Sequence, residues 1–144
     1  MSTTVFVNFP VSNLSASSAF YEALGFKKNA VFSNDDASAM VWDETFSIML
    51  LTRDFYQKFI AEKTIADTQK QSGALIAFTL PSPAAVKAFA EKAKASGGSY
   101  HSVDMGIPEE QMVGYEVHDL DGNTLEPVWM KGEVYSCGLG ESPS

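Results

Sequence analysis

The sequence has a single cysteine, Cys137, among its 144 residues, so the chain cannot form an internal disulfide bond. Absence of a disulfide framework is typical of proteins in a reducing compartment. The N-terminus lacks a basic segment followed by an apolar one, and no apolar run approaches membrane-spanning length. These absences predict a cytoplasmic protein that does not cross a membrane.

Positive charge is also scarce. The chain has 10 Lys and Arg residues against 18 Asp and Glu residues, a formal net charge of −8, and its basic residues form no cluster. Nucleic acids and anionic membrane surfaces bind basic patches, so neither is an expected partner. The sequence also lacks a glycine-rich phosphate loop followed by Lys-Ser or Lys-Thr, and it lacks a nucleophile elbow.

Hydrophobic residues make up 45% of the sequence and aromatic residues 12%, which is enough for a packed globular core. Periodicity and turn residues predict a βαβββ module with strands at 5–11, 27–31, 37–42 and 46–51, and a helix that ends at Gly25. The same order recurs with strands at 74–80, 99–103, 112–118 and 124–129, and a helix that ends at Gly97. A repeat of this size is a strong indication of architecture.

The predicted fold class is therefore α+β. We expect two βαβββ modules, at about 1–60 and 73–131, to form one curved, cupped mixed sheet with the helices on its convex side. Residues 1–131 would make a single domain. Residues 132–144 are rich in Gly, Ser and Pro and are expected to form a loosely ordered C-terminal tail.

The most informative carboxylate is Glu126, which follows the tight turn predicted for Asp119–Asn123. Strand alternation places Leu125 and Trp129 on one face and Glu126 on the other. The same alternation on the preceding strand puts Glu116 on the face of Glu126. An ionised carboxylate on a mostly apolar strand needs a partner, a ligand or water.

Two motifs carry a family resemblance. Residues 11–26, VSNLSASSAFYEALGF, resemble the opening motif V-x-D-L-x-x-S-x-x-F-Y-x-x-L-G-F of the vicinal oxygen chelate superfamily, and residues 119–126, DLDGNTLE, resemble its closing motif D-P-D-G-x-x-x-E. Asn13 and Leu120 depart from these motifs by replacing Asp and Pro. The superfamily includes glyoxalase I, extradiol dioxygenases and bleomycin-resistance proteins, and the chain most resembles bacterial proteins related to lactoylglutathione lyase.

The resemblance also identifies four positions at which metal-using members carry ligands, typically His, Gln and Glu. Here they fall on Phe6, on Leu50 or one of its two neighbours, on Leu75 and on Glu126. Three apolar side chains and one carboxylate do not make a specific site for zinc, iron or manganese. We therefore expect no metal and no other cofactor.

The two histidines offer little support for a metal. His101 is expected at the surface or at a sheet edge. His118 either faces the cup beside Glu126 or lies as a partly exposed residue at a strand end, and the pattern leaves both open. Even in the first case the cup would contain only two ligands.

The cup is expected to bind a small molecule through aromatic, aliphatic and a few polar side chains. The candidate ligand-binding residues are Phe6, Asn8, Trp42, Leu50, Leu75, Met112 and Glu126. Each apolar member also fits an ordinary core position, whereas Asn8 and Glu126 require a polar partner on an apolar face.

Three functions remain open. The leading hypothesis is a metal-free protein that binds a small organic molecule in the cup. The second is a glyoxalase-like lyase or isomerase with Glu126 as its catalytic base. The third is a protein whose cup is filled by its own side chains. The family resemblance, together with the sheet edges that need cover, predicts a homodimer.

Overall fold

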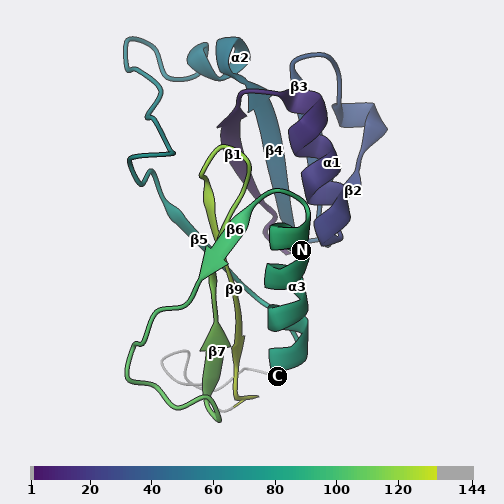
Figure 1. Ribbon diagram of the computed structural model, residues 1–144. Coiled ribbons are helices and arrows are strands. Elements are labelled where there is room, and N and C mark those ends of the chain that lie inside the picture. Colours follow the sequence, from purple (N-terminus) through teal and green to yellow (C-terminus); the bar gives the residue numbers. More distant parts are fainter. Residues whose placement is uncertain (1, 133–144) are drawn as a thin grey trace.

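The computed structural model describes residues 2–132 and contains the two βαβββ modules, so the predicted fold class is confirmed (Figure 1). The first module consists of β1 (Val5–Val11), α1 (Leu14–Leu24), β2 (Lys27–Lys28), the 3₁₀ helix η1 (Ala30–Phe32), β3 (Ala37–Val41) and β4 (Phe46–Thr52). The linker contains the short helix α2 (Arg53–Gln57). The second module consists of β5 (Leu75–Thr79), α3 (Pro83–Ala95), β6 (Ser99–His101), β7 (Met112–Gly114), β8 (Glu116–His118) and β9 (Thr124–Met130). The tail predicted for 132–144 lies outside the described residues, apart from Gly132.

The strands form two sheets of the same topology. The first has the order β1-β4-β3-β2, and the second has the order β5-β9-β8-β6 with β7 also paired to β9. In each module the first strand pairs in parallel with the last, and the remaining pairs are antiparallel. Within residues 2–132 the backbone ladders thus make two mixed sheets, where a single continuous one was expected.

Local capping explains where the two long helices begin and end. The Asn13 side chain accepts a hydrogen bond from the backbone N–H of Ala16 at 2.9 Å, and Ser82 caps α3 in the same way, followed by proline in the first turn. Gly25 ends α1 with φ of 112°, a left-handed conformation that glycine adopts without steric cost. The predicted end of the first helix at Gly25 is confirmed, whereas α3 ends at Ala95 with Ser96 as its cap, just before the predicted Gly97.

The strand predicted for 112–118 is interrupted at Tyr115. Its register continues across the gap, because Gly114 pairs with Val128 and Val117 pairs with Leu125. The residue opposite Tyr115 is Pro127, which has no backbone N–H to donate. One rung of the ladder is therefore weak, and the strand divides into β7 and β8.

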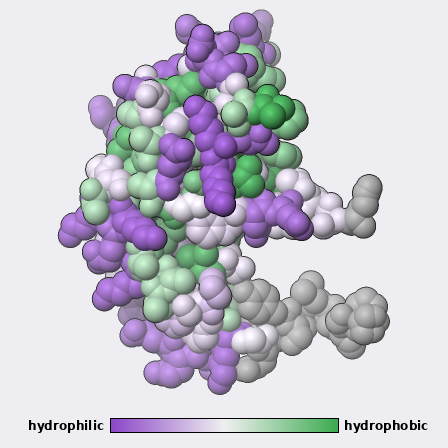
Figure 2. All heavy atoms as spheres, turned by 90° about the vertical axis from the view of Figure 1, so that its right-hand side faces the viewer, coloured by the Kyte–Doolittle hydropathy of each residue, from purple (hydrophilic) through white to green (hydrophobic). Residues whose placement is uncertain are grey.

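Both long helices lie on the same side of the sheets, at the right of Figure 1. Viewed from that side, hydrophilic residues are spread over much of the surface (Figure 2). Beneath them a single core cluster unites residues of both modules, including Phe20, Leu24, Leu50, Phe89 and Leu125. Among residues 2–132, no long helix lies on the opposite face of the two sheets, which we call the open face.

Aromatic side chains join the modules within this core. Trp42, just after β3, packs its ring against Phe78 of β5 and Phe89 of α3, with centroid separations of 5.7 and 5.9 Å. Phe46 contacts Phe78 at 5.2 Å. Edge-on and tilted aromatic pairs at such distances are favourable beyond their buried area.

The turn between β8 and β9 is the second junction between the modules. The buried Asp119 carboxylate accepts hydrogen bonds from the Tyr21 hydroxyl at 2.8 Å, from the backbone N–H groups of Asp121 and Asn123 at 2.9 Å each, and from the Asn123 side-chain amide at 3.1 Å. Asp121 in turn accepts from the backbone N–H of Ser12 at 3.0 Å. These bonds fix the second hairpin to helix α1 and its entry.

Among the described residues, no helix has the length and apolarity that crossing a bilayer requires.

Candidate functional site

Two carboxyl groups lie side by side on the open face of the second module. The β8–β9 register, in which Val117 pairs with Leu125, brings Glu116 opposite Glu126. Burial, a side-chain hydrogen bond with Glu126 and the charge of Glu126 raise the pKa of Glu116 to about 7. Glu116 therefore keeps its proton at mildly acidic pH and releases it around pH 7.

Apolar groups surround this pair. Val103 and Met105, from the loop after β6, join Met112 and both glutamates around a cavity of about 70 Å³. The neighbouring side chains bury Glu116 in part, and this partial burial is the largest cause of its raised pKa.

The raised pKa of Glu116 predicts how the stability of the protein depends on pH. The pKa of Glu116 is about 7 in the folded protein, against 4.5 for an ordinary glutamate. The folded state therefore binds this proton more tightly than the unfolded chain does, and the free energy of unfolding falls as the pH rises from about 4.5 to about 7. Glu116→Gln should remove that decline and stabilise the protein above pH 7 by about 1 kcal/mol, a value reduced for solvent screening. Urea denaturation at a series of pH values measures this effect.

Glu22→Gln, on the exposed surface of α1, provides the matched control and should retain the wild-type pH dependence. Equal pH profiles for wild type and Glu116→Gln would show that the pKa of Glu116 is not raised.

Five of the predicted ligand-binding residues lie on the open face: Phe6, Asn8, Leu75, Met112 and Glu126. Phe6 is 56% exposed and Leu75 is 58% exposed, large values for apolar side chains. Phe6 lines a second, mostly apolar cavity of about 530 Å³ together with Ser47 and Met49. Asn8 lies at a smaller cavity between β1 and the start of β5.

Two of the predicted residues lie on the other face, and their placement in the cup is corrected. Leu50 is fully buried in the core cluster beneath the helices. Trp42 packs against Phe78 and Phe89, as described above. On β4 the open-face residues are instead Ser47 and Met49, because the alternation is offset by one residue from the expected one.

His118 lies on the open face, one of the two placements that the sequence left open. Its Nδ1 lies 3.2 Å from the Thr124 hydroxyl and its Nε2 lies 3.0 Å from Nδ1 of His101, whose ring stacks on it. Burial, followed by the charge of His101, lowers the pKa of His118. Its bonding partners are therefore Thr124 and His101 rather than Glu126.

The geometry can now be compared with known proteins. The family model of the Glyoxalase/Bleomycin resistance protein/Dioxygenase superfamily matches residues 4–126. The chain belongs to this superfamily. The match confirms the resemblance carried by the two sequence motifs, and it covers both modules from β1 to Glu126.

Several solved structures share the fold at low sequence identity. A glyoxalase/bleomycin resistance protein/dioxygenase family enzyme from Burkholderia phytofirmans matches with a TM-score of 0.71 and 16% identity, over 90% of this chain and all (100%) of the other. A hypothetical protein from S. aureus matches with a TM-score of 0.69 and 21% identity, over 90% and 94% of the chains. A bleomycin-binding protein complexed with bleomycin matches with a TM-score of 0.61 and 17% identity, over 90% and 100%. No curated protein matches the chain.

The residues of this chain do not fit the metal that some members of the superfamily use. The ligand positions implied by the motifs hold Phe6, Leu75, Glu126 and, on the open face of β4, Met49. Phenyl and alkyl groups have no lone pair, and a thioether is a poor ligand for a hard cation. Among residues 2–132, no group of three or more His, Cys, Asp or Glu side chains is arranged to hold a metal ion.

Strand alternation alone places Glu116 on the face of Glu126 but assigns it no role. The signal that identifies the pair is the hairpin register, which places positions 116 and 126 opposite each other once the Asp119–Asn123 turn is fixed. His101 was missed as the partner of His118 because their contact depends on the β6–β8 pairing.

Proposed function

We propose that the protein binds a small organic molecule on its open face without a metal ion. The observation that carries this proposal is the placement of two carboxyl groups, Glu116 and Glu126, opposite each other on the same face as apolar side chains that are more than half exposed. Polar groups on an apolar concave surface orient a ligand, whereas the apolar groups supply contact area. Exposed Phe6 and Leu75 fit this second role.

The chemistry of the pair favours a ligand with an apolar body and a hydrogen-bond donor or a positive charge. A carboxylate accepts hydrogen bonds, and a bond to an ionised group is worth about twice a neutral one. The acidic net charge of −8 adds attraction for a cation. A distant structural neighbour binds bleomycin, which supports small-molecule binding as the kind of function.

The large exposed apolar residues argue against a cup filled by its own side chains. The cavity beside Phe6 measures about 530 Å³, which is within the size range of small-molecule sites, and it lies on the first module, apart from the cavity of about 70 Å³ that the carboxyl pair lines. The homodimer expected from the free sheet edges stays a prediction.

This proposal predicts the effect of Glu126→Gln. Metal-free bleomycin and a library of organic cations would be screened against the dialysed protein by thermal shift, and the strongest ligand would be measured by calorimetry. Glu126→Gln keeps the shape of the side chain and should weaken that ligand by about 1–3 kcal/mol, since a ligand donor loses its carboxylate acceptor. Binding should persist in the presence of a chelator.

Two results would overturn the proposal. One is unchanged affinity in both Glu126→Gln and Phe6→Ala, which would place the ligand elsewhere. The other is binding that appears only after a divalent metal is added. Glu22→Gln again serves as the control for the loss of one surface charge.

The raised pKa of Glu116 favours a second candidate function, a lyase or isomerase that uses Glu126 as base. A carboxyl pair that exchanges a proton near neutral pH is suited to general acid–base catalysis. In that case Glu126→Gln would lower turnover of a glutathione hemithioacetal by about 100-fold or more while leaving its binding within a few-fold. If the wild-type protein did not turn over this substrate, the catalytic function would be excluded for it and ligand binding would remain as the proposed function.

A further inference from the structure

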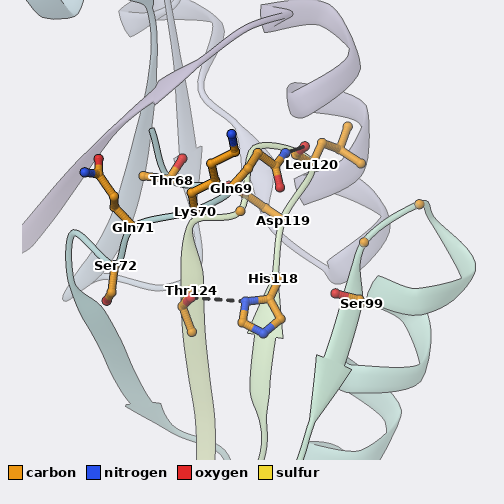
Figure 3. A pocket seen from close by; sticks show the side chains of 13 residues that line it. Thr68, Gln69, Lys70, Gln71, Ser72, Ser99, His118, Asp119, Leu120 and Thr124 are labelled. Atoms are coloured by element: carbon orange, nitrogen blue, oxygen red, sulfur yellow. Dashed lines mark hydrogen bonds between the residues drawn. The ribbon is translucent and has the colours of Figure 1, made fainter. Parts of the chain in front are cut away.

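A fourth cavity lies at the opposite end of the second sheet from the loop after β6. It measures about 570 Å³, a volume typical of small-molecule sites. Residues 68–72 of the linker form one wall, and the ends of β6, β8 and β9 form the other (Figure 3). Neither Glu116 nor Glu126 lines it, so it is separate from the carboxyl pair.

The walls of this cavity are fixed to one another. The Thr68 hydroxyl donates to the backbone carbonyl of Asp121 at 2.5 Å, and the Gln69 amide donates to that of Leu120 at 3.0 Å. Gly122 has φ of +86°, and a Cβ there would lie 2.3 Å from the Thr68 carbonyl oxygen. The linker can approach the turn this closely only because position 122 is glycine.

The electrostatics of the cavity differ from those of the acidic chain. Among the described residues that line it, Asp119 is the only carboxylate, and it already accepts four hydrogen bonds from within the protein. Its lining lysine, Lys70, forms no ion pair in the described part of the chain. The remaining polar groups include the hydroxyls of Ser99 and Thr124, and Figure 3 shows both near the His118 ring.

We propose that this cavity binds the carboxylate or phosphate group of a small molecule. The Ser99 hydroxyl supplies a hydrogen-bond donor from β6, and the Thr124 hydroxyl supplies one from β9 when it accepts from His118 Nδ1. The His118 ring lies beside them with both of its nitrogens already bonded, to Thr124 and to His101. Lys70 supplies a full positive charge from the linker, on a flexible four-carbon stem that allows its ammonium group to reach an anion. The proposal goes beyond the function assigned to the carboxyl pair and does not depend on it.

Phosphate and acetate, each titrated separately at constant ionic strength, are the probes. Two-dimensional NMR follows the His118 ring and the amides of Gly98 and Ser99. We expect saturable shifts at these sites. Lys70→Met should raise the apparent Kd about fivefold or more, and Ser99→Ala about threefold, the scale of one lost charge-assisted or neutral hydrogen bond.

The matched control is Lys87→Met, an exposed lysine on α3 that does not line the cavity, and it should leave the Kd unchanged. Saturation by phosphate alone would assign the cavity to a phosphate group, whereas saturation by both probes would assign it to oxyanions in general. Shifts that grow linearly with concentration, or that are the same in Lys70→Met and wild type, would overturn the proposal.

The His118 ring supplies a second readout. A nearby anion favours protonated imidazole, so phosphate should raise the pKa of His118, opposite to the lowering that burial and His101 cause. The other titratable or charged groups on the elements around the ring are His101, Lys70, Asp119 and Glu116, and the same titration without phosphate serves as their control. An unchanged pKa of His118 at saturating phosphate would contradict binding beside the ring.

Discussion

Replacing Asp119 with alanine is expected to lower the free energy of unfolding by about 3–5 kcal/mol, because several buried donors lose their acceptor together. Asp119 is only 6% exposed, and the Tyr21 side chain that donates to it is fully buried at 0%. The Asn123 amide, at 5% exposure, is left with a single long bond to the carbonyl of Pro10 at 3.4 Å. Urea denaturation followed by circular dichroism measures the loss.

Milder substitutions keep this prediction testable if Asp119→Ala does not fold. Asp119→Asn keeps the shape and one acceptor, and it should cost less than the alanine variant. Tyr21→Phe removes a single hydrogen bond and should cost about 1–2 kcal/mol. A loss below about 1 kcal/mol in Asp119→Ala would show that the turn does not hold the two modules together.

The sequence predicted this turn but not its long-range role. Asp, Gly and Asn within five residues form a local turn signal that depends on backbone conformations alone. The hydrogen bond from Tyr21 to Asp119 joins residues 98 positions apart. Such a contact depends on how α1 packs against the second hairpin, and periodicity within either element carries no information about it.

The candidate site was predictable where polar and apolar residues alternate. On β9, Thr124 and Glu126 alternate with Leu125, so the face of Glu126 follows from the strand period. The structure adds that Glu116 is its neighbour. The placement of Glu116 opposite Glu126 follows from the register of the hairpin. That register is fixed by the geometry of the turn, which strand alternation does not specify.

The prediction was wrong on β3 and β4 because both faces of these strands are apolar. Ile48 and Leu50 alternate with Met49 and Leu51, and Met40 alternates with Ala39 and Val41. When both faces are hydrophobic, a shift of one residue leaves the pattern unchanged while every side chain moves to the other face. The structure puts the larger side chains under the helices and leaves Ser47 and Met49 on the open face.

The corrected placement predicts opposite outcomes for two residues that the sequence assigned to one cup. Leu50→Ala should lower the free energy of unfolding by about 2–5 kcal/mol, because it leaves a cavity in a core where Leu50 is fully buried at 0% exposure. Phe6→Ala removes a larger side chain that is 56% exposed, and should cost less than about 1 kcal/mol. Urea denaturation of both variants under the same conditions makes the comparison. If Phe6→Ala lowered the free energy of unfolding strongly and Leu50→Ala did not change it, Leu50 would lie on the open face. The assignment of the two faces of the first sheet would then be reversed.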